Sequence, residues 1–210
     1  GGRFGADLPL VSSVLLPALC LRHGGADTLP PELVAALVAG RALLGAAVDD
    51  APQEPLIAQS VRDGFLLAGR KVACLNAAGA AAHLVLTPDA VFLVPADTRG
   101  VSVEPYALVD GRAAADLRFD AVALPATARI GGAALAGLLR DAGALALAAD
   151  ALGAMLRINA LTLEHLQTRQ QFGQKIGRFQ VLQHRMVDMW SDAEFACAAA
   201  QGGVQVAVED

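Results

Sequence analysis

The side chains best suited to chemistry lie between residues 168 and 189. Arg169 has a planar guanidinium that can bind a diphosphate through two parallel hydrogen bonds, and the neighbouring glycines allow the backbone to come close to a ligand. Phe172 and Phe179 can pack against a flat heterocycle, and the amide of Gln180 offers a donor and an acceptor to an adenine or a ribose. Together these residue types are compatible with a site for an anionic cofactor.

The same residues also allow a purely structural interpretation. An arginine at the end of a helix commonly complements the last carbonyl groups, and a Phe-Gly pair commonly forms the turn between two helices. His184 is a lone histidine in this segment, and we assign it no catalytic role. Trp190 and the three methionines are interpreted as core or interface residues.

Composition disfavours several other functions. Cys20, Cys74 and Cys197 lie far apart without a CxxC pair, so we expect no metal site and a reduced, cytoplasmic setting. The formal net charge is −5, and we find no basic face of the kind that nucleic-acid binding requires. Charges or prolines interrupt the apolar stretches before the roughly 18 residues of a membrane span, so we expect none. The chain begins at Gly1, which indicates a trimmed N-terminus.

Three zones of different composition must position the segment. We predict a partial helical region at 1–54, a β-domain at 55–130 and a partial helical domain at 131–210, which together make an α+β protein. Short apolar runs between turn signals in the middle zone predict an antiparallel sheet, sandwich or small barrel. These runs cover residues 65–67, 83–86, 91–94, 101–103 and 117–119.

Helices are expected in the two outer zones. Pro30 and Pro31 introduce an apolar run that ends at Gly40, which predicts a helix, and residues 49–59 are expected to form a loop. Residues 133–168 contain no proline and few charges, which predicts a long helix buried on most sides.

Three glycines would weaken the predicted long helix, and a loop ends it. Gly137, Gly143 and Gly153 would each cost about 1 kcal/mol relative to alanine unless a closely packed neighbour compensates. A glycine-containing loop at 172–177 then separates the long helix from a second one, which runs from about Phe179 towards residue 208.

The segment at 168–189 fits the pattern TRxQFGxxIGxFQxxQHxxxDM. This pattern resembles the signature of the acyl-CoA dehydrogenase family of flavoproteins, and its length argues against a chance match. Weaker similarity to the family extends over residues 33–47, 69–77 and 93–101. The order of the zones is also similar to the family's fold, which has N-terminal helices, a middle β-domain and a C-terminal bundle of long helices.

The resemblance implies a cofactor and partners. In this family the matching residues contact an FAD that is held mainly by the neighbouring subunit. A homo- or hetero-oligomer, either dimer or tetramer, is therefore implied. An acyl-CoA substrate, an electron-transfer acceptor, a role in fatty acid metabolism and a cytoplasmic location are implied as well. The residues implied to contact FAD or to lie beside it are Arg169, Gln170, Gln171, Phe172, Phe179 and Gln180.

The family's reaction needs a base that this sequence does not supply at the matching position. A carboxylate removes the proton α to the thioester carbonyl while the β-hydride leaves to flavin N5. Some branches of the family place this carboxylate early in the long helix, where the present chain has Gly143, followed by Ala144 at an arginine position. Asp141 is the nearest carboxylate, but two residues turn a helix by about 200°. The catalytic residue is therefore unknown.

Two further departures lie in the β-domain. The family's flavin-binding loop resembles TEPGxGSD, whereas residues 48–55 read VDDAPQEP and lack its glycines and hydroxyls. The usual Trp-Ile-Thr is replaced by Ala73-Cys74-Leu75, which removes a hydroxyl expected near the flavin ring. We associate such erosion with the smaller subunits of heteromeric members, such as those resembling the pimeloyl-CoA dehydrogenase small subunit. Compared with the family, the chain reads as truncated at both ends.

Three hypotheses follow. The first is FAD-dependent α,β-dehydrogenation of an acyl-CoA thioester with the catalytic base outside this chain. The second is a non-catalytic supporting subunit of a heteromeric acyl-CoA dehydrogenase that contributes flavin contacts to a partner. The third is an unrelated helical protein that carries the motif by chance.

Overall fold

The computed structural model describes residues 10–24 and 28–209, with side chains described as far as Val204. By its internal contacts the chain divides into two compact units. One unit, here called the β unit, covers the described residues up to Asp141, and the other, the helical unit, begins at Ala142. The first nine residues of the predicted region 1–54 lie outside the described residues, and the predicted boundaries at 54 and 130 stay predictions.

The β unit begins with short helices. A π-helical turn, Val11–Leu15, leads into α1 (Leu16–Gly24), and α2 (Pro31–Val38) follows. The helix predicted after the proline pair is confirmed, and Gly40 follows it at φ +66°, a left-handed conformation that glycine adopts at low cost.

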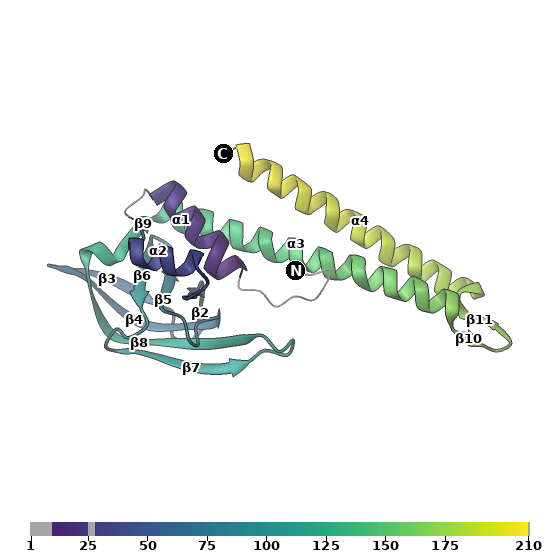
Figure 1. Ribbon diagram of the computed structural model, residues 1–210, viewed down its shortest axis with the longest axis horizontal. Coiled ribbons are helices and arrows are strands. Elements are labelled where there is room, and N and C mark those ends of the chain that lie inside the picture. The colour runs from purple at the N-terminus through teal and green to yellow at the C-terminus, as the bar shows by residue number, and fades with distance from the viewer. Residues whose placement is uncertain (1–9, 25–27, 210) are drawn as a thin grey trace. The chain divides into compact units, whose positions relative to one another are not determined.

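A mixed sheet makes up the rest of the β unit (Figure 1). Its main strand order is β7-β8-β4-β1-β5-β6-β9, with β2 and β3 also paired to β4. The strands are β1 (Leu44–Ala47), β2 (Asp49–Asp50), β3 (Ile57–Val61), β4 (Gly64–Leu75), β5 (Ala82–Leu86), β6 (Ala90–Pro95), β7 (Val101–Ala107), β8 (Ala113–Pro125) and β9 (Arg129–Gly132).

Two sequence-based expectations about this sheet need correction. The pairing is antiparallel except between β1 and β5, which run parallel, with Leu44 opposite Ala82. Residues 49–59 are not wholly a loop, because β2 and the start of β3 lie there and pair with β4. The strongly polar composition of 49–59 hides these strands, since both lie at a sheet edge where carboxylates remain solvated.

Two apolar clusters cover the two faces of the central strands. Leu84 of β5 packs with Leu16 and Leu29 on the side of α1 and α2, whereas Val85 packs with Phe92 and Leu117 on the other side. All five residues of β5 are buried, so this strand shows no alternation of polar and apolar residues.

Two long helices dominate the C-terminal half of the chain. Helix α3 spans Ala133–Thr168, as predicted, and α4 spans Gln180–Glu209. The helical unit contains α4 and the part of α3 from Ala142 onward, and the first turns of α3 belong to the β unit. Between them lie two short strands, β10 (Gln170–Gln171) and β11 (Gln174–Lys175), and a single 3-10 turn, Ile176–Arg178.

The expectation that α3 is buried on most sides is wrong for the part of the chain that the structure describes. Its most apolar 18-residue window is 0% buried, and a Cβ added at Gly137 or Gly143 would have no atom within 4 Å. By length and composition alone, α3 is also long and apolar enough to cross a membrane. The core helix of a non-membrane protein can meet the same two criteria. The absence of a membrane span stays a prediction.

Candidate functional site

The segment predicted to contact a cofactor forms a hairpin between α3 and α4, here called the hairpin segment (residues 169–180). Its two strands pair Gln170 with Lys175 and Gln171 with Gln174. The turn residues are Phe172 at φ +54° and Gly173 at φ +76°, which is the positive-φ pattern of a two-residue type I′ turn. Glycine suits such a turn, but a bulky phenylalanine at positive φ is unusual.

The two predicted aromatic residues contact each other. The ring centroids of Phe172 and Phe179 lie 6.1 Å apart, and the rings meet edge to face at 81°. Phe172 is nevertheless 90% exposed at the tip of the hairpin, whereas Phe179 is half-buried. A Phe ring held outward on a strained turn leaves an apolar surface exposed at the tip of the hairpin.

The other predicted residues are gathered around these rings. Arg169 follows the last residue of α3, its N–H donates to the carbonyl of His165, and its own carbonyl accepts from the N–H of Ile176 at 2.9 Å. Gln170 and Gln171 form β10, and Gln180 is the first residue of α4. All four side chains are exposed. The structure therefore brings the predicted set together at one end of the helical unit (Figure 1).

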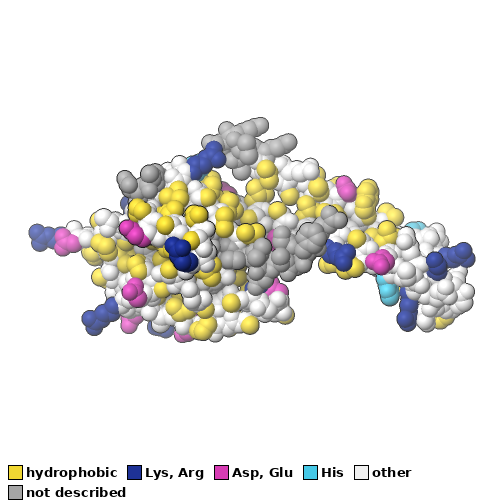
Figure 2. Space-filling view, in the orientation of Figure 1, with side chains coloured by type: hydrophobic (Ala, Val, Ile, Leu, Met, Phe, Trp, Pro, Cys, Tyr) yellow, Lys and Arg dark blue, Asp and Glu magenta, His cyan; other side chains and the backbone are white. Residues whose placement is uncertain are grey.

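This end of the helical unit is positively charged. Between His165 and Val187 the sequence holds four cations and no carboxylate, whereas the rest of the chain holds 12 cations (16 − 4) against 21 carboxylates. Figure 2 shows dark blue side chains there. Among the described residues none of the four makes an ion pair. They are Arg169, Lys175, Arg178 and Arg185, and all are exposed.

The β unit contains the second segment that the family pattern assigns to flavin, here called the loop segment (residues 48–56). It is organised around Lys71, a fully buried side chain of β4. The Nζ of Lys71 donates to the carbonyl of Val48 at 2.9 Å and lies 2.8 Å from Oδ1 of Asp50. Burial lowers the pKa of Lys71, against the opposing effect of the Asp50 carboxylate. Sequence reasoning did not find this buried ion pair.

The loop segment uses its own backbone donors. The N–H of Leu56 donates to Oδ1 of Asp50, and the N–H of Glu54 donates to the carbonyl of Ala51. A Cβ added at Gly69 of β4 would lie 2.4 Å from the carbonyl oxygen of Pro55, so the loop segment packs directly on β4. These donors are therefore not free for a phosphate, and Asp49, Asp50 and Glu54 add three carboxylates.

A polar network covers the neighbouring part of β4. A bulge at Ala73, at φ +51°, lets its N–H donate to Oδ1 of Asp116 and to the Tyr106 hydroxyl, both at 3.1 Å. Arg70 contacts Asp116 at 2.9 Å and Glu104 at 2.7 Å. Burial would raise the pKa of Asp116, but hydrogen bonds from Tyr106, Ala73 and Arg70 together hold it below its usual range. The free N–H that the bulge creates is thus satisfied internally.

His83 of β5 is a second buried polar group that the sequence analysis missed. It is fully buried, and neither ring nitrogen has a hydrogen-bond partner among the described residues. A Cβ added at Gly45 would lie 2.6 Å from its Nδ1, so the imidazole sits over this glycine. Burial lowers the pKa of His83 and keeps the ring neutral.

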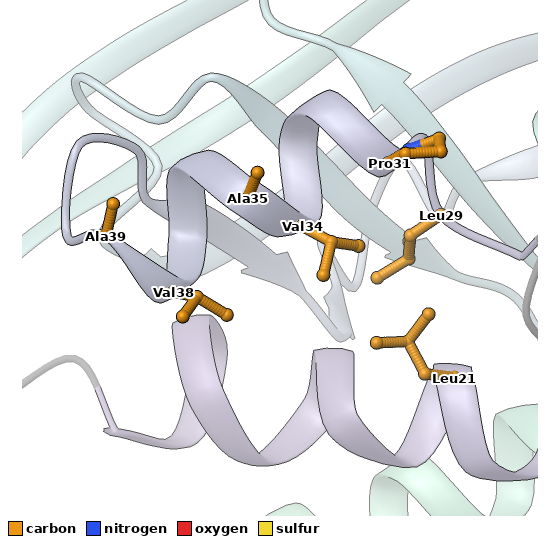
Figure 3. A pocket seen from close by; sticks show the side chains of 7 residues that line it. All are labelled: Leu21, Leu29, Pro31, Val34, Ala35, Val38 and Ala39. Carbon is orange, nitrogen blue, oxygen red and sulfur yellow. The ribbon is translucent and has the colours of Figure 1, made fainter.

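Pockets in the two units differ in chemistry. A groove of about 810 Å³ between α1 and α2 is lined by apolar side chains alone (Figure 3). It offers no group for catalysis. A pocket of about 440 Å³ lies behind the hairpin segment and includes Gln167, Gly177, Gln183 and Trp190. The second pocket adjoins the predicted residues, so it is the one relevant to the site.

The positions at which the family pattern predicts a base and an arginine lie in α3. They hold Gly143 and Ala144, which carry no reactive side chain. Among residues 10–24 and 28–209 there is also no group of His, Cys, Asp and Glu that could hold a metal ion.

Comparisons with known proteins identify the family. Residues 132–208 match the family model "Acyl-CoA dehydrogenase, C-terminal domain". The chain is 30% identical over 194 residues to acyl-CoA dehydrogenase FadE27 of Mycobacterium tuberculosis, which covers 90% of this chain and 52% of FadE27. The chain belongs to the acyl-CoA dehydrogenase family. It spans about half the length of FadE27.

Solved structures support the same fold. The ChsE4-ChsE5 complex from M. tuberculosis matches with a TM-score of 0.88 and 30% identity, over 98% of this chain and 58% of that one. PigA with FAD and proline matches with a TM-score of 0.79 and 23% identity, over 97% of this chain and 60% of that one. The predicted family and α+β fold are confirmed. FAD, the cofactor that the resemblance implied, is present in the PigA structure.

Proposed function

We propose that this chain contributes the hairpin segment to an FAD site in an oligomeric flavoenzyme that dehydrogenates an acyl-CoA thioester between its α and β carbons. The observation that carries the proposal is the exposed hairpin, whose strained aromatic tip lies in a stretch with four cations and no carboxylate in an otherwise acidic chain. FadE27 is named as an acyl-CoA dehydrogenase, which supports the reaction class.

The residues of the hairpin segment fit the cofactor. Arg169 would bind the diphosphate through its guanidinium, which makes no ion pair among the described residues. Phe172 and Phe179 would pack against a ring of the nucleotide. Gln180, together with the amides of β10, would hydrogen-bond to the ribose or the adenine.

The chemistry divides between the cofactor and the protein. FAD, when bound, supplies the hydride acceptor. The residues described above bind and orient it, and they exclude water from the face they cover. Removal of the α-proton needs a carboxylate, and we place this base outside the described residues of this chain, because Gly143 occupies the alternative position.

A second candidate function is a supporting subunit that lends its hairpin to a partner's flavin and performs no chemistry. The carboxylate-rich loop segment favours it, because a diphosphate would meet like charge there and the N–H groups of Ala51, Glu54 and Leu56 already donate within the β unit. The ChsE4-ChsE5 structure is a complex of two differently named proteins, and it provides a precedent for a heteromeric assembly. In either case we propose a cytoplasmic assembly in fatty acid metabolism that passes electrons to a separate acceptor.

The test is a titration with FAD followed by an activity assay. The purified chain is titrated with FAD, alone and with a candidate partner subunit, and bound flavin is measured by absorbance near ~450 nm and by fluorescence anisotropy. Oxidation of an acyl-CoA with an artificial electron acceptor by the chain alone supports an enzyme. Oxidation of the acyl-CoA only when the partner subunit is present favours the second function, a non-catalytic supporting subunit. Failure to bind FAD in any assembly overturns both functions.

A further inference from the structure

The hairpin segment is small and needs an anchor. Each of its strands has two residues, and isolated hairpins of this kind are at best marginally stable in water. The contact between Phe172 and Phe179 lies within the segment and does not fix its direction relative to the helices. Something outside the two strands must therefore hold the hairpin in one orientation.

Two contacts provide such an anchor. A Cβ added at Gly177 would lie 2.8 Å from the carbonyl oxygen of Leu166, so the chain returning from the hairpin presses against the end of α3. Leu166 is one of the few buried apolar residues of the helical unit, with 8% of its surface exposed. The side-chain amide of Gln183 on α4 then donates to the carbonyl of Gly177 at 3.0 Å. The chain that leaves the hairpin is thus held to both helices at Gly177.

We propose that Gly177 and Gln183 are positioning residues that hold the hairpin segment in the orientation in which Arg169 and Phe172 meet the flavin. This proposal rests on the proposed function, since it concerns how the hairpin is presented to FAD. Gln183 is exposed and Gly177 has no side chain, so neither contributes to a core, and their contacts serve the hairpin. A hairpin held in one orientation binds with less ordering cost than a mobile one.

The decisive variant is Gln183→Met, which keeps the length of the side chain and removes its donor. Gln167→Met is the matched control, because Gln167 lines the same pocket and makes no hydrogen bond among the described residues. Hydrogen exchange of the amides at 170–179 is measured on the chain without FAD, and FAD affinity is measured by titration in the assembly that binds it. We expect exchange about 5-fold faster and FAD affinity about 5-fold weaker in Gln183→Met, with unchanged helix content.

Gly177→Ala provides the second test. The added methyl group forces the hairpin away from Leu166, so we expect a loss of FAD affinity of about 10-fold or more. Unchanged exchange and affinity in Gln183→Met, or equal changes in Gln167→Met, would overturn the proposal. The proposed function fails separately if Arg169→Ala and Phe172→Ala leave FAD affinity unchanged. The exchange measurement does not require FAD, so it decides the positioning role in either case.

Discussion

The hairpin segment and the loop segment are both parts of this chain that the family pattern assigns to flavin, but the hairpin segment keeps that pattern and the loop segment has lost it. The hairpin segment is exposed and cationic, and its cations make no ion pairs among the described residues. The loop segment carries carboxylates, packs on Gly69 and uses backbone donors on its own residues and on β4. Under the proposed function, this chain keeps the half of a cofactor site that would serve a neighbour, while the half that would serve the chain itself has closed.

The largest expected effect concerns what holds the loop segment closed. Lys71→Met removes the buried cation and leaves Asp50 without its ion pair. We expect the free energy of unfolding to fall by about 2–3 kcal/mol. This loss is below the usual range for fully buried pairs because Asp50 is partly solvated. Urea denaturation measures it. The double variant with Asp50→Asn, which retains the acceptor for Leu56, should recover part of the loss. A single variant as stable as the parent would show that the pair does not hold the loop.

The next effect tests the hairpin side of the comparison. Arg169→Ala should weaken FAD binding by about 10- to 100-fold, because under the proposed function it removes a charge-assisted pair of hydrogen bonds to the diphosphate. Arg157→Ala is the control, since Arg157 is an exposed arginine elsewhere on α3. Equal losses in both variants would mean that overall charge, rather than a specific contact, attracts the cofactor.

Sequence patterns found the hairpin better than the loop for a physical reason. The bounds of α3 were predictable because a stretch without proline ends at a Phe-Gly turn, and the motif placed Arg169 and Phe172 together. Parallel pairing of β1 was not predictable, because the LGAA run of this strand has weak strand propensity. The burial of Lys71 was missed because it depends on tertiary packing around a bulge, which charge and hydropathy do not encode.

An effect of moderate size concerns His83 in the β unit. Its pKa is lowered by burial in the folded state, so the unfolded chain takes up a proton first as the pH falls below the usual histidine value of about 6.5. Stability is fully present above that value and should fall by up to about 1.4 kcal/mol per pH unit below it, until the lowered pKa is reached. Denaturation measured between pH 5 and 7 (roughly the window in which histidine titrates) tests this slope.

Comparison of two variants assigns that slope. His83→Leu should flatten it and cost little stability near neutral pH, because the ring nitrogens have no partner to lose. His184→Leu replaces an exposed histidine on α4 and should leave the slope unchanged. If stability still falls steeply with pH in His83→Leu, the acid sensitivity arises from the carboxylates of the β unit and not from His83.

The smallest effect is the sharpest test of the comparison, because stability and binding should change in opposite directions. Phe172→Asn places the preferred Asn-Gly pair in the type I′ turn, which should relieve about 1 kcal/mol of strain and raise the melting temperature by about 2–4 °C. The same change removes the ring that we propose packs against FAD, and it should weaken FAD binding by roughly 2- to 10-fold. A residue retained only to link two helices would gain stability without any loss of binding. Weaker binding in the more stable variant would show that the strained phenylalanine serves the cofactor.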